Sequence, residues 1–200
     1  MINNVLLYNS GGGIGDSLQI LPLINTLKSK FSNTKFFYLS AHENHFNSSL
    51  KDFNSQIDTL DLNMKYFGFR WWHALVVKRK IKNKSIYLFD LIIDLQSKIR
   101  NSLILKLIPH KSFISSCLNF HLSNPNLKIL KEKKNYNTVL KAINTIYEKN
   151  YKIEEFNINK IDKKFFNESE KLLQFRIIPV IISIGIFIPV WDTNKLQELF

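Results

Sequence analysis

A glycine-rich loop that ends in an acid is the first candidate for chemistry in this chain. Residues 10–22 read SGGGIGDSLQILP, with three consecutive glycines, a fourth at position 15 and a carboxylate at Asp16. Glycines leave room for a ligand to approach the backbone, and a carboxylate beside that space can take a proton from a substrate hydroxyl. The loop therefore predicts either a nucleotide-binding turn or a turn that presents Asp16 to a substrate.

The spacing of the glycines excludes two common nucleotide-binding motifs. A dinucleotide fingerprint needs glycines at its first, third and sixth positions, but the sixth position is Asp16 or Ser17 in the two possible frames. A P-loop needs Gly-Lys-Ser/Thr, and no lysine occurs between Gly11 and Lys28. A methyltransferase-like loop that binds S-adenosylmethionine remains a possible interpretation, because Gly11, Gly13 and Gly15 alternate after Asn9. That family has an acid at the position of Asn9.

A purely structural role for these residues is also open. Asp16 and Gln19 form a D-x-x-Q pattern, which is typical of a capping box at the start of a helix. Capping would explain one or two glycines that permit a tight turn. It would not explain four, nor Pro22 inside the expected helix.

A second group of polar residues follows the most apolar segment, YLFDLIIDLQ at 87–96. Asp94 and Gln96 lie near its carboxyl end, where open α/β sheets bind ligands. Alternation along a strand predicts that both point to one face, so that one contacts a ligand while the other supports a loop. In the alternative interpretation, Asp94 only caps the following helix. Arg100 comes next along the chain and could contact an acidic ligand.

Other reactive side chains favour structural roles. His42 and His45, in HENH, lack the spacing of a zinc motif, so we expect no metal site. Cys117 has no partner for an internal disulfide and predicts a small buried side chain. Trp71 and Trp72 could dock on a membrane surface, but packing inside the fold is the expectation.

The composition predicts a folded chain with acidic partners. The 200 residues are 45% hydrophobic and carry a formal charge of +12, which favours phosphorylated or otherwise acidic ligands. Because 24 of the 28 basic residues are lysines, AT-rich codon bias is an alternative source of this charge. The N-terminus lacks the features of a signal peptide, and the apolar run 177–190 is too short to span a bilayer. We expect a cytoplasmic protein, either free or peripheral on the inner membrane.

Hydrophobic patterning predicts alternating strands and helices. Strands are expected at 4–9, 35–40, 57–62, 87–96 and 112–116, and helices at 16–32, 45–53, 71–84, 97–108, 136–149 and 162–174. This order is typical of an α/β fold with a doubly wound parallel sheet. Residues 177–200 read as a strand followed by a short helix. We therefore expect one domain over 1–176 and the first βα unit of an incomplete second domain over 177–200.

Four segments resemble the glycosyltransferase family 9, the ADP-heptose:lipopolysaccharide heptosyltransferases. Gly15-Asp16-SLQIL-Pro22 is similar to the family's N-terminal GD-x5-P signature, and FDLIIDLQSKIRNSLIL at 89–105 is similar to its "DLviDLQ" strand and following helix. The segment 135–147 is placed like the helix before the family's interdomain crossing. Gly185 and Trp191 are placed like the first loop of its C-terminal domain.

The resemblance implies a GT-B architecture of two Rossmann-like domains, with the acceptor bound by the first and the nucleotide sugar by the second. It implies Asp16 as the general base. The substrate-binding residues would be Gly12, Gly13, Gly15, Asp94, Gln96 and Arg100. The donor would be ADP-heptose, used as a substrate and without a separate cofactor. The acceptor would be an acidic glycolipid or glycan such as the lipopolysaccharide core, with no nucleic acid as a partner.

The sequence departs from the family where the donor should bind. Residues 186–190 read IFIPV, without the expected lysine, and Asp192 stands where a proline would follow the tryptophan. Most of the donor half is missing from these 200 residues. Two functions remain open: the acceptor-binding half of a heptosyltransferase-like enzyme, or a non-catalytic module that keeps only the acceptor site.

Overall fold

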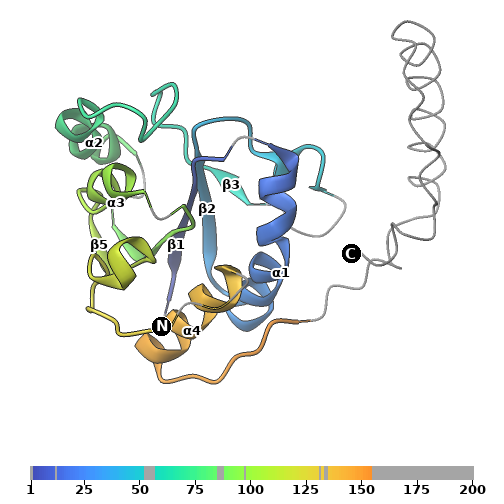
Figure 1. The fold of residues 1–200 in the computed structure, drawn as a ribbon. Coiled ribbons are helices and arrows are strands. Elements are labelled where there is room, and N and C mark those ends of the chain that lie inside the picture. Colours follow the sequence, from blue (N-terminus) through green and yellow to red (C-terminus); the bar gives the residue numbers. More distant parts are fainter. Residues whose placement is uncertain are drawn as a thin grey trace, which may run out of the picture. The chain divides into compact units, whose positions relative to one another are not determined.

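Five parallel strands form the centre of the protein (Figure 1). They are β1 (Asn4–Asn9), β2 (Lys35–Ser40), β3 (Asp58–Thr59), β4 (Phe89–Asp94) and β5 (His110–Ser115). Their order in the sheet is β3-β2-β1-β4-β5. The order reverses between β1 and β4, so the predicted doubly wound parallel sheet of Rossmann type is confirmed.

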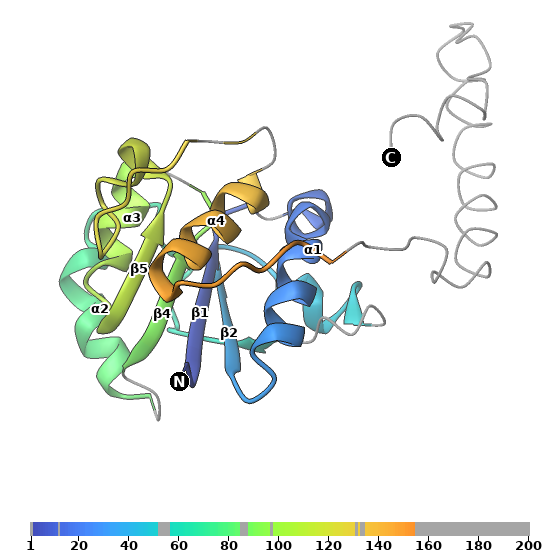
Figure 2. The same cartoon turned by 90° about the horizontal axis from the view of Figure 1, so that it is seen from below.

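Helices cover both faces of this sheet (Figure 2). The α-helices are α1 (Ile14–Lys30), α2 (His73–Lys82), α3 (Ile99–Leu105) and α4 (Asn135–Tyr147), and two short 3-10 helices are η1 (His45–Asn47) and η3 (Cys117–Phe120). One face packs against α1 and α4, and the other against α2 and α3. The side chains of β1 alternate between the two faces of the sheet. Val5 and Leu7 pack on the α1 side, whereas Leu6 and Tyr8 pack on the α2 side.

This computed structural model describes residues 2–11, 13–51, 57–84, 88–96, 98–130, 132 and 135–154. All of them belong to one compact unit, Met1–Phe156. The expected helix at 162–174, the predicted domain boundary at 176/177 and the βα unit of 177–200 lie outside the described residues. No helix in the described part of the chain is long and apolar enough to cross a bilayer.

Three local predictions are corrected by the structure. In the described residues, the helix expected at 45–53 begins as a 3-10 turn over His45–Asn47 and is interrupted at Ser48, whose φ of −119° and ψ of −97° are not helical. The strand expected at 57–62 is only Asp58–Thr59. Trp71 and Trp72 do not pack inside the fold, since their side chains are 60% and 48% exposed. The buried position predicted for Cys117 is confirmed.

Candidate functional site

The carboxyl ends of β1 and β4 lie side by side at the point where the strand order reverses. Tyr8 pairs with Asp94 in the register of these strands, and Leu95 N continues the pairing by donating to Tyr8 O at 3.0 Å. The glycine loop after β1 and the segment after β4 therefore leave the sheet together. In doubly wound sheets this edge is the place where ligands bind.

Asp16 lies at this edge with its carboxylate folded back over Gly11. A Cβ atom on Gly11 would stand 2.6 Å from Asp16 Cγ and closer still to Oδ2. Only glycine fits here without movement of the acid. Asp16 is exposed, and it forms no hydrogen bond or ion pair with another residue that the structure describes. The loop thus presents a free carboxylate to solvent.

The start of α1 rules out the capping-box interpretation. The helix begins at Ile14, its N-cap is Gly13, and no side chain caps it. Asp16 is the third helical residue and lies in the first turn, where its negative charge is favourable. Gly15 faces open space, with no atom within 4 Å of the position that a Cβ would occupy. Gly12 lies outside the described residues.

Asn9 joins the two loops of the site. Its Oδ1 atom accepts a hydrogen bond from Gly11 N at 3.0 Å and another from Gln96 Nε2 at 2.5 Å. Gln96 is half-buried, so part of its side chain reaches the same surface as the glycine loop. A third amide, Asn135 at the start of α4, donates from Nδ2 to Leu95 O at 3.0 Å. The structure thus brings Gln96 and the glycine loop together.

Asp94 lies beneath the surface and faces the other side of the sheet. Its side chain is fully buried. Oδ2 accepts hydrogen bonds from the hydroxyls of Ser102 and Ser115, and Oδ1 accepts one from Gln96 N at 3.0 Å. The helix-cap interpretation is wrong, because α3 begins at Ile99 and no side chain caps it. The prediction that Asp94 and Gln96 point to one face of the sheet is wrong, because β4 ends at Asp94 and the alternation of side chains along the strand does not extend to Gln96. Asp94 is buried, whereas Gln96 is half-buried.

Arg100 lies at the border of the site, on α3. Its Nε atom donates to Gly68 O at 2.8 Å, and its guanidinium lies 5.9 Å from the centre of the Phe69 ring. Gly68 has φ +87°, and a Cβ there would approach Asn101 Cγ to 3.1 Å and the Tyr8 hydroxyl more closely. Glycine is therefore required at the point that fixes Arg100.

Tyr38 borders the glycine loop from β2. Burial raises the pKa of Tyr38 to about 12, although hydrogen bonds with Asn9 and Ser17 oppose this, and the nearby charge of Asp16 raises it further. The phenol therefore stays neutral at physiological pH. Its hydroxyl is buried and hydrogen-bonds with Asn9 and Ser17, so it supports the loop from below.

Sequence reasoning did not assign Asn9 or Asn135 to the site. Both are asparagines at an element boundary, Asn9 at the end of β1 and Asn135 at the start of α4. That position is the only signal in the sequence, since asparagine is common in turns. Their partners become known only when the two loops are folded against each other.

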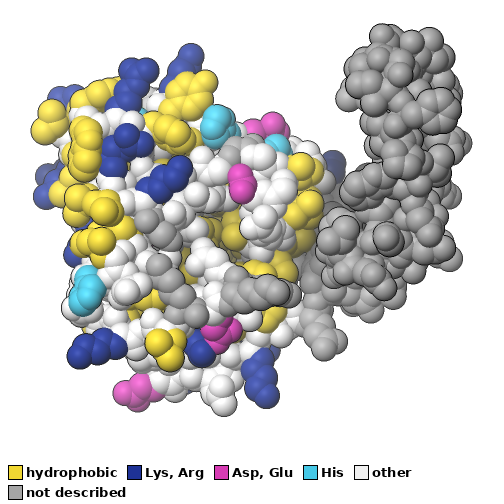
Figure 3. Space-filling model, viewed as in Figure 1, with side chains coloured by type: hydrophobic (Ala, Val, Ile, Leu, Met, Phe, Trp, Pro, Cys, Tyr) yellow, Lys and Arg dark blue, Asp and Glu magenta, His cyan; other side chains and the backbone are white. Residues whose placement is uncertain are grey.

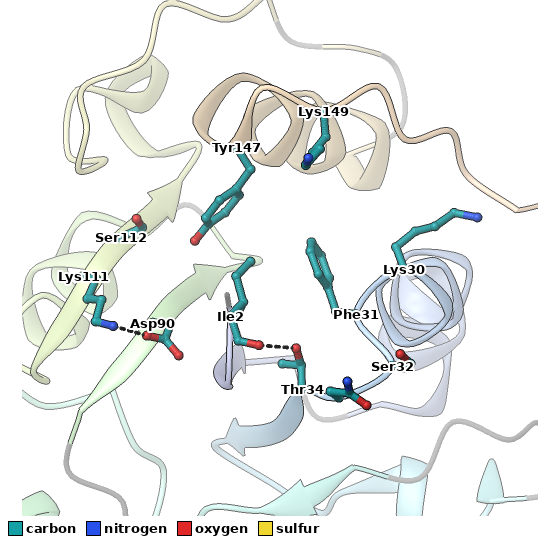
Figure 4. A pocket seen from close by; sticks show the side chains of 11 residues that line it. Ile2, Lys30, Phe31, Ser32, Thr34, Asp90, Lys111, Ser112, Tyr147 and Lys149 are labelled. Carbon is teal, nitrogen blue, oxygen red and sulfur yellow. Dashed lines mark hydrogen bonds and ion pairs between the residues drawn. The ribbon is translucent and has the colours of Figure 1, made fainter.

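Two hollows lie at opposite edges of the sheet. One, of about 510 Å³, lies at the carboxyl edge and is formed by residues 39–42 and 59–65. The other, of about 610 Å³, lies at the amino edge and includes Lys30, Asp90, Lys111 and Tyr147 (Figure 4). None of the predicted site residues lines the larger hollow. Among the described residues, no three His, Cys, Asp or Glu side chains are grouped to hold a metal ion.

The comparisons with known proteins identify the fold. No family model matches the sequence, and no curated protein matches it. Among solved structures, E. coli heptosyltransferase WaaC with ADP matches with a TM-score of 0.53 at 14% identity, covering 77% of this chain and 50% of that one. WaaC with ADP-2-deoxy-2-fluoro heptose gives 0.53 at 14% identity, covering 76% and 50%. The glycosyl transferase family 9 structure from Veillonella parvula gives 0.54 at 13% identity, covering 86% and 49%.

This chain therefore spans about half the length of the solved structures that it matches. The identity is low, so the likeness concerns the path of the backbone. Together with the parallel sheet and its strand order, it shows that the chain has the fold of about half of a glycosyltransferase family 9 structure.

Proposed function

We propose that the carboxyl edge of this sheet binds the sugar acceptor of an inverting glycosyl transfer, with Asp16 as the general base. The observation that carries the proposal is the free carboxylate of Asp16, exposed at the carboxyl edge of β1 and seated on Gly11. Asp94, at the end of the neighbouring strand β4, differs from Asp16 because it is fully buried and accepts hydrogen bonds.

The reaction needs one proton acceptor on the protein. The Asp16 carboxylate takes the proton of the acceptor hydroxyl as its oxygen attacks the anomeric carbon of the donor. The bond from that carbon to the nucleoside diphosphate breaks, the diphosphate leaves with the electron pair, and the configuration inverts. Alignment of the acceptor hydroxyl against Asp16 contributes to the rate in this proposal.

The remaining site residues have separate roles in this proposal. Gly12, Gly13 and Gly15 leave room for the acceptor ring against the loop, and Gln96 and Arg100 donate hydrogen bonds to it. Asp94 acts as a positioning residue, because its carboxylate holds the backbone amide of Gln96. The hollow formed by residues 39–42 and 59–65 offers space at the same edge for further sugars of the acceptor.

The substrates are proposed by similarity. The matched structures are heptosyltransferases with ADP and with a fluorinated ADP-heptose, which supports ADP-heptose as the donor and the lipopolysaccharide inner core as the acceptor. That core is acidic, in agreement with the positive charge of this chain. We place the reaction in the cytoplasm, where nucleotide sugars are available.

Calorimetric titration with delipidated inner-core oligosaccharide tests the acceptor site. We expect binding by the wild-type chain and at least tenfold weaker binding by Gln96→Ala, because this change removes a donor at the surface of the site. Asp58→Asn, an exposed acid on β3, is the matched control and should bind as the wild type does. Equal affinity for all three proteins, or no binding by any, would overturn the proposal.

A transfer assay separates the enzyme from the non-catalytic alternative. The chain is incubated with ADP-heptose and the oligosaccharide, and the mass of the oligosaccharide product is measured by mass spectrometry. A mass increase of one heptose supports catalysis, whereas binding without transfer supports a module that only holds the acceptor. Stabilisation by S-adenosylmethionine in a thermal-shift assay would instead support the methyltransferase interpretation of the glycine loop.

A further inference from the structure

Exposed aromatic and basic side chains gather over α2 and the turn before it. In Figure 3 they occupy the upper left of the molecule, where Figure 1 places α2. Trp71, Trp72 and Leu75 are 60%, 48% and 84% exposed. Monomeric proteins rarely expose several large apolar side chains side by side without a partner. We call the surface formed by Trp71, Trp72, Leu75, Lys78, Arg79 and Lys82 the α2 surface.

The spacing of these residues places them on the outer side of the helix. Leu75, Lys78 and Lys82 follow one another at intervals of three or four residues, which is one face of α2, and Trp71 lies in the turn before the helix. The opposite face of α2, with His73, Val77 and Ile81, is buried against the sheet. The helix thus uses one face for the core and leaves a second, amphipathic face unpartnered.

The charge around this face has one sign. No acid occurs between Asp61 and Asp90, whereas this stretch contains seven lysines and arginines. The three described ion pairs, Lys30–Glu154, Lys111–Asp90 and Lys141–Glu132, lie elsewhere in the fold. Lys98, from the segment before α3, extends the positive surface and lies 5.8 Å from the Phe69 ring.

We propose that the α2 surface docks the protein on an anionic lipid bilayer. Tryptophan favours the membrane–water interface, where its ring is apolar and its N–H stays hydrated. Leucine inserts among the acyl chains, and lysines and arginines bind the anionic headgroups. A helix that contacts a bilayer through one exposed amphipathic face lies in the plane of the membrane. The proposal concerns binding to lipid and does not depend on glycosyl transfer.

The α2 surface adjoins the candidate site. Arg100 donates to Gly68 O and lies over the Phe69 ring, and these two residues are separated from Trp71 by Arg70 alone. A protein bound to a bilayer through α2 would hold the carboxyl edge of the sheet close to the headgroups. This arrangement suits an acceptor that is itself anchored in lipid.

Vesicle binding by the full chain tests the proposal directly. Trp71 and Trp72 are two of three tryptophans, and the third is Trp191. In Trp191→Phe, all tryptophan fluorescence therefore comes from the α2 surface. With vesicles of 70% phosphatidylcholine and 30% phosphatidylglycerol that carry brominated acyl chains, we expect quenching and a blue shift. With phosphatidylcholine alone we expect at least tenfold weaker binding.

Two sets of variants locate the contact. Lys78→Gln/Arg79→Gln/Lys82→Gln should weaken binding to anionic vesicles about 100-fold, since each cation at an anionic surface contributes about fivefold. Its control, Lys35→Gln/Lys149→Gln/Lys152→Gln, removes the same charge from exposed positions outside α2 and should retain most of the binding. Trp71→Ser/Leu75→Ser should reduce the quenching, whereas Leu118→Ser/Leu130→Ser, also exposed, should not.

Three outcomes would overturn the proposal. They are absence of quenching by anionic brominated vesicles, equal loss of binding in the α2 and control charge variants, and vesicle binding in which the tryptophans stay unquenched. Tight binding to single-stranded DNA together with absent quenching would assign the surface to a soluble polyanion instead. Circular dichroism and thermal melting of every variant exclude loss of fold as the cause.

Discussion

The carboxylate of Asp16 rests on Gly11, at a distance that leaves no room for a methyl group between them. The two residues are five positions apart and belong to the loop after β1 and the first turn of α1. A side chain at position 11 would therefore require the Asp16 carboxylate to move. The proposed chemistry depends on the position of this carboxylate.

Alanine substitutions at two glycines should therefore act in opposite directions. Gly11→Ala forces Asp16 or the loop to move, so we expect lower thermal stability and at least tenfold weaker binding of the acceptor oligosaccharide. Gly15→Ala adds a methyl group that meets no other atom in the first turn of α1, and it should raise the free energy of unfolding by roughly 0.5–1 kcal/mol. If Gly15 makes room for a sugar, the same variant should still bind more weakly. Urea denaturation and calorimetry measure the two effects separately.

Replacement of Asp16 by asparagine should separate stability from catalysis. The residue is exposed and has no described hydrogen bond, so we expect the free energy of unfolding to change by less than about 0.5 kcal/mol. Where transfer is measurable, its rate should fall by about 10²–10⁴-fold, as is usual for loss of a general base. A large loss of stability with an unchanged rate would mean that Asp16 serves the fold.

Asp94 should behave in the opposite way to Asp16. Its buried carboxylate accepts three hydrogen bonds, and asparagine cannot accept all of them, so Asp94→Asn should lower the free energy of unfolding by about 2 kcal/mol or more. Ser115→Ala removes one of the donors. The double variant should lose less than the sum of the two single changes, because both act on one hydrogen bond. Strict additivity in urea titrations would contradict this arrangement.

The ion pair between Asp90 and Lys111 predicts a pH dependence. Burial alone would raise the pKa of Asp90, but hydrogen bonds from Lys111 and from the amides of Asn3 and Asn4 outweigh it and hold the pKa below the ordinary value of 3.8. A lowered pKa means that the contribution to stability is present above about pH 3.8. It is lost as the pH falls below that value and the folded protein takes up the proton.

Asp90→Asn should thus be less stable than the wild type at pH 7, and the difference should shrink as the pH falls below 4. Urea midpoints between pH 7 and pH 3 give the comparison. An exposed acid, Glu148→Gln, is the control for general charge effects. A difference that is constant over this range would show that the charged form of Asp90 contributes no stability.

The strands could be predicted from the sequence because their signals are local. The bounds of β1 and β2, 4–9 and 35–40, agree with the predicted ranges, since continuous apolar runs end there at glycine, serine or asparagine. The segment 57–62 has a weaker pattern, interrupted by Asp58 and Asp61, and only Asp58 and Thr59 pair with β2, although β2 continues to Ser40. An edge strand has only one neighbour, and the length over which it stays paired with that neighbour is not contained in the pattern.

The candidate site could be predicted only in part, for a similar reason. The glycine loop and Asp16 stand out by composition, and the edge that carries Gln96 follows from the strand order. The burial of Asp94 depends on Ser102 and Ser115, which lie on other elements. The exposure of Trp71 and Trp72 likewise depends on which face of α2 meets the sheet, and both faces carry apolar residues.

Asn9 couples the two loops of the site, because its Oδ1 atom accepts one hydrogen bond from Gly11 N and another from Gln96 Nε2. A shift of either loop must stretch or release the bond to the other. A sugar that engages Gln96 would therefore change the conformational freedom of the glycine loop before any contact with it. The edge would respond to its ligand as one cooperative unit, with affinity at one subsite set partly by occupancy of the next.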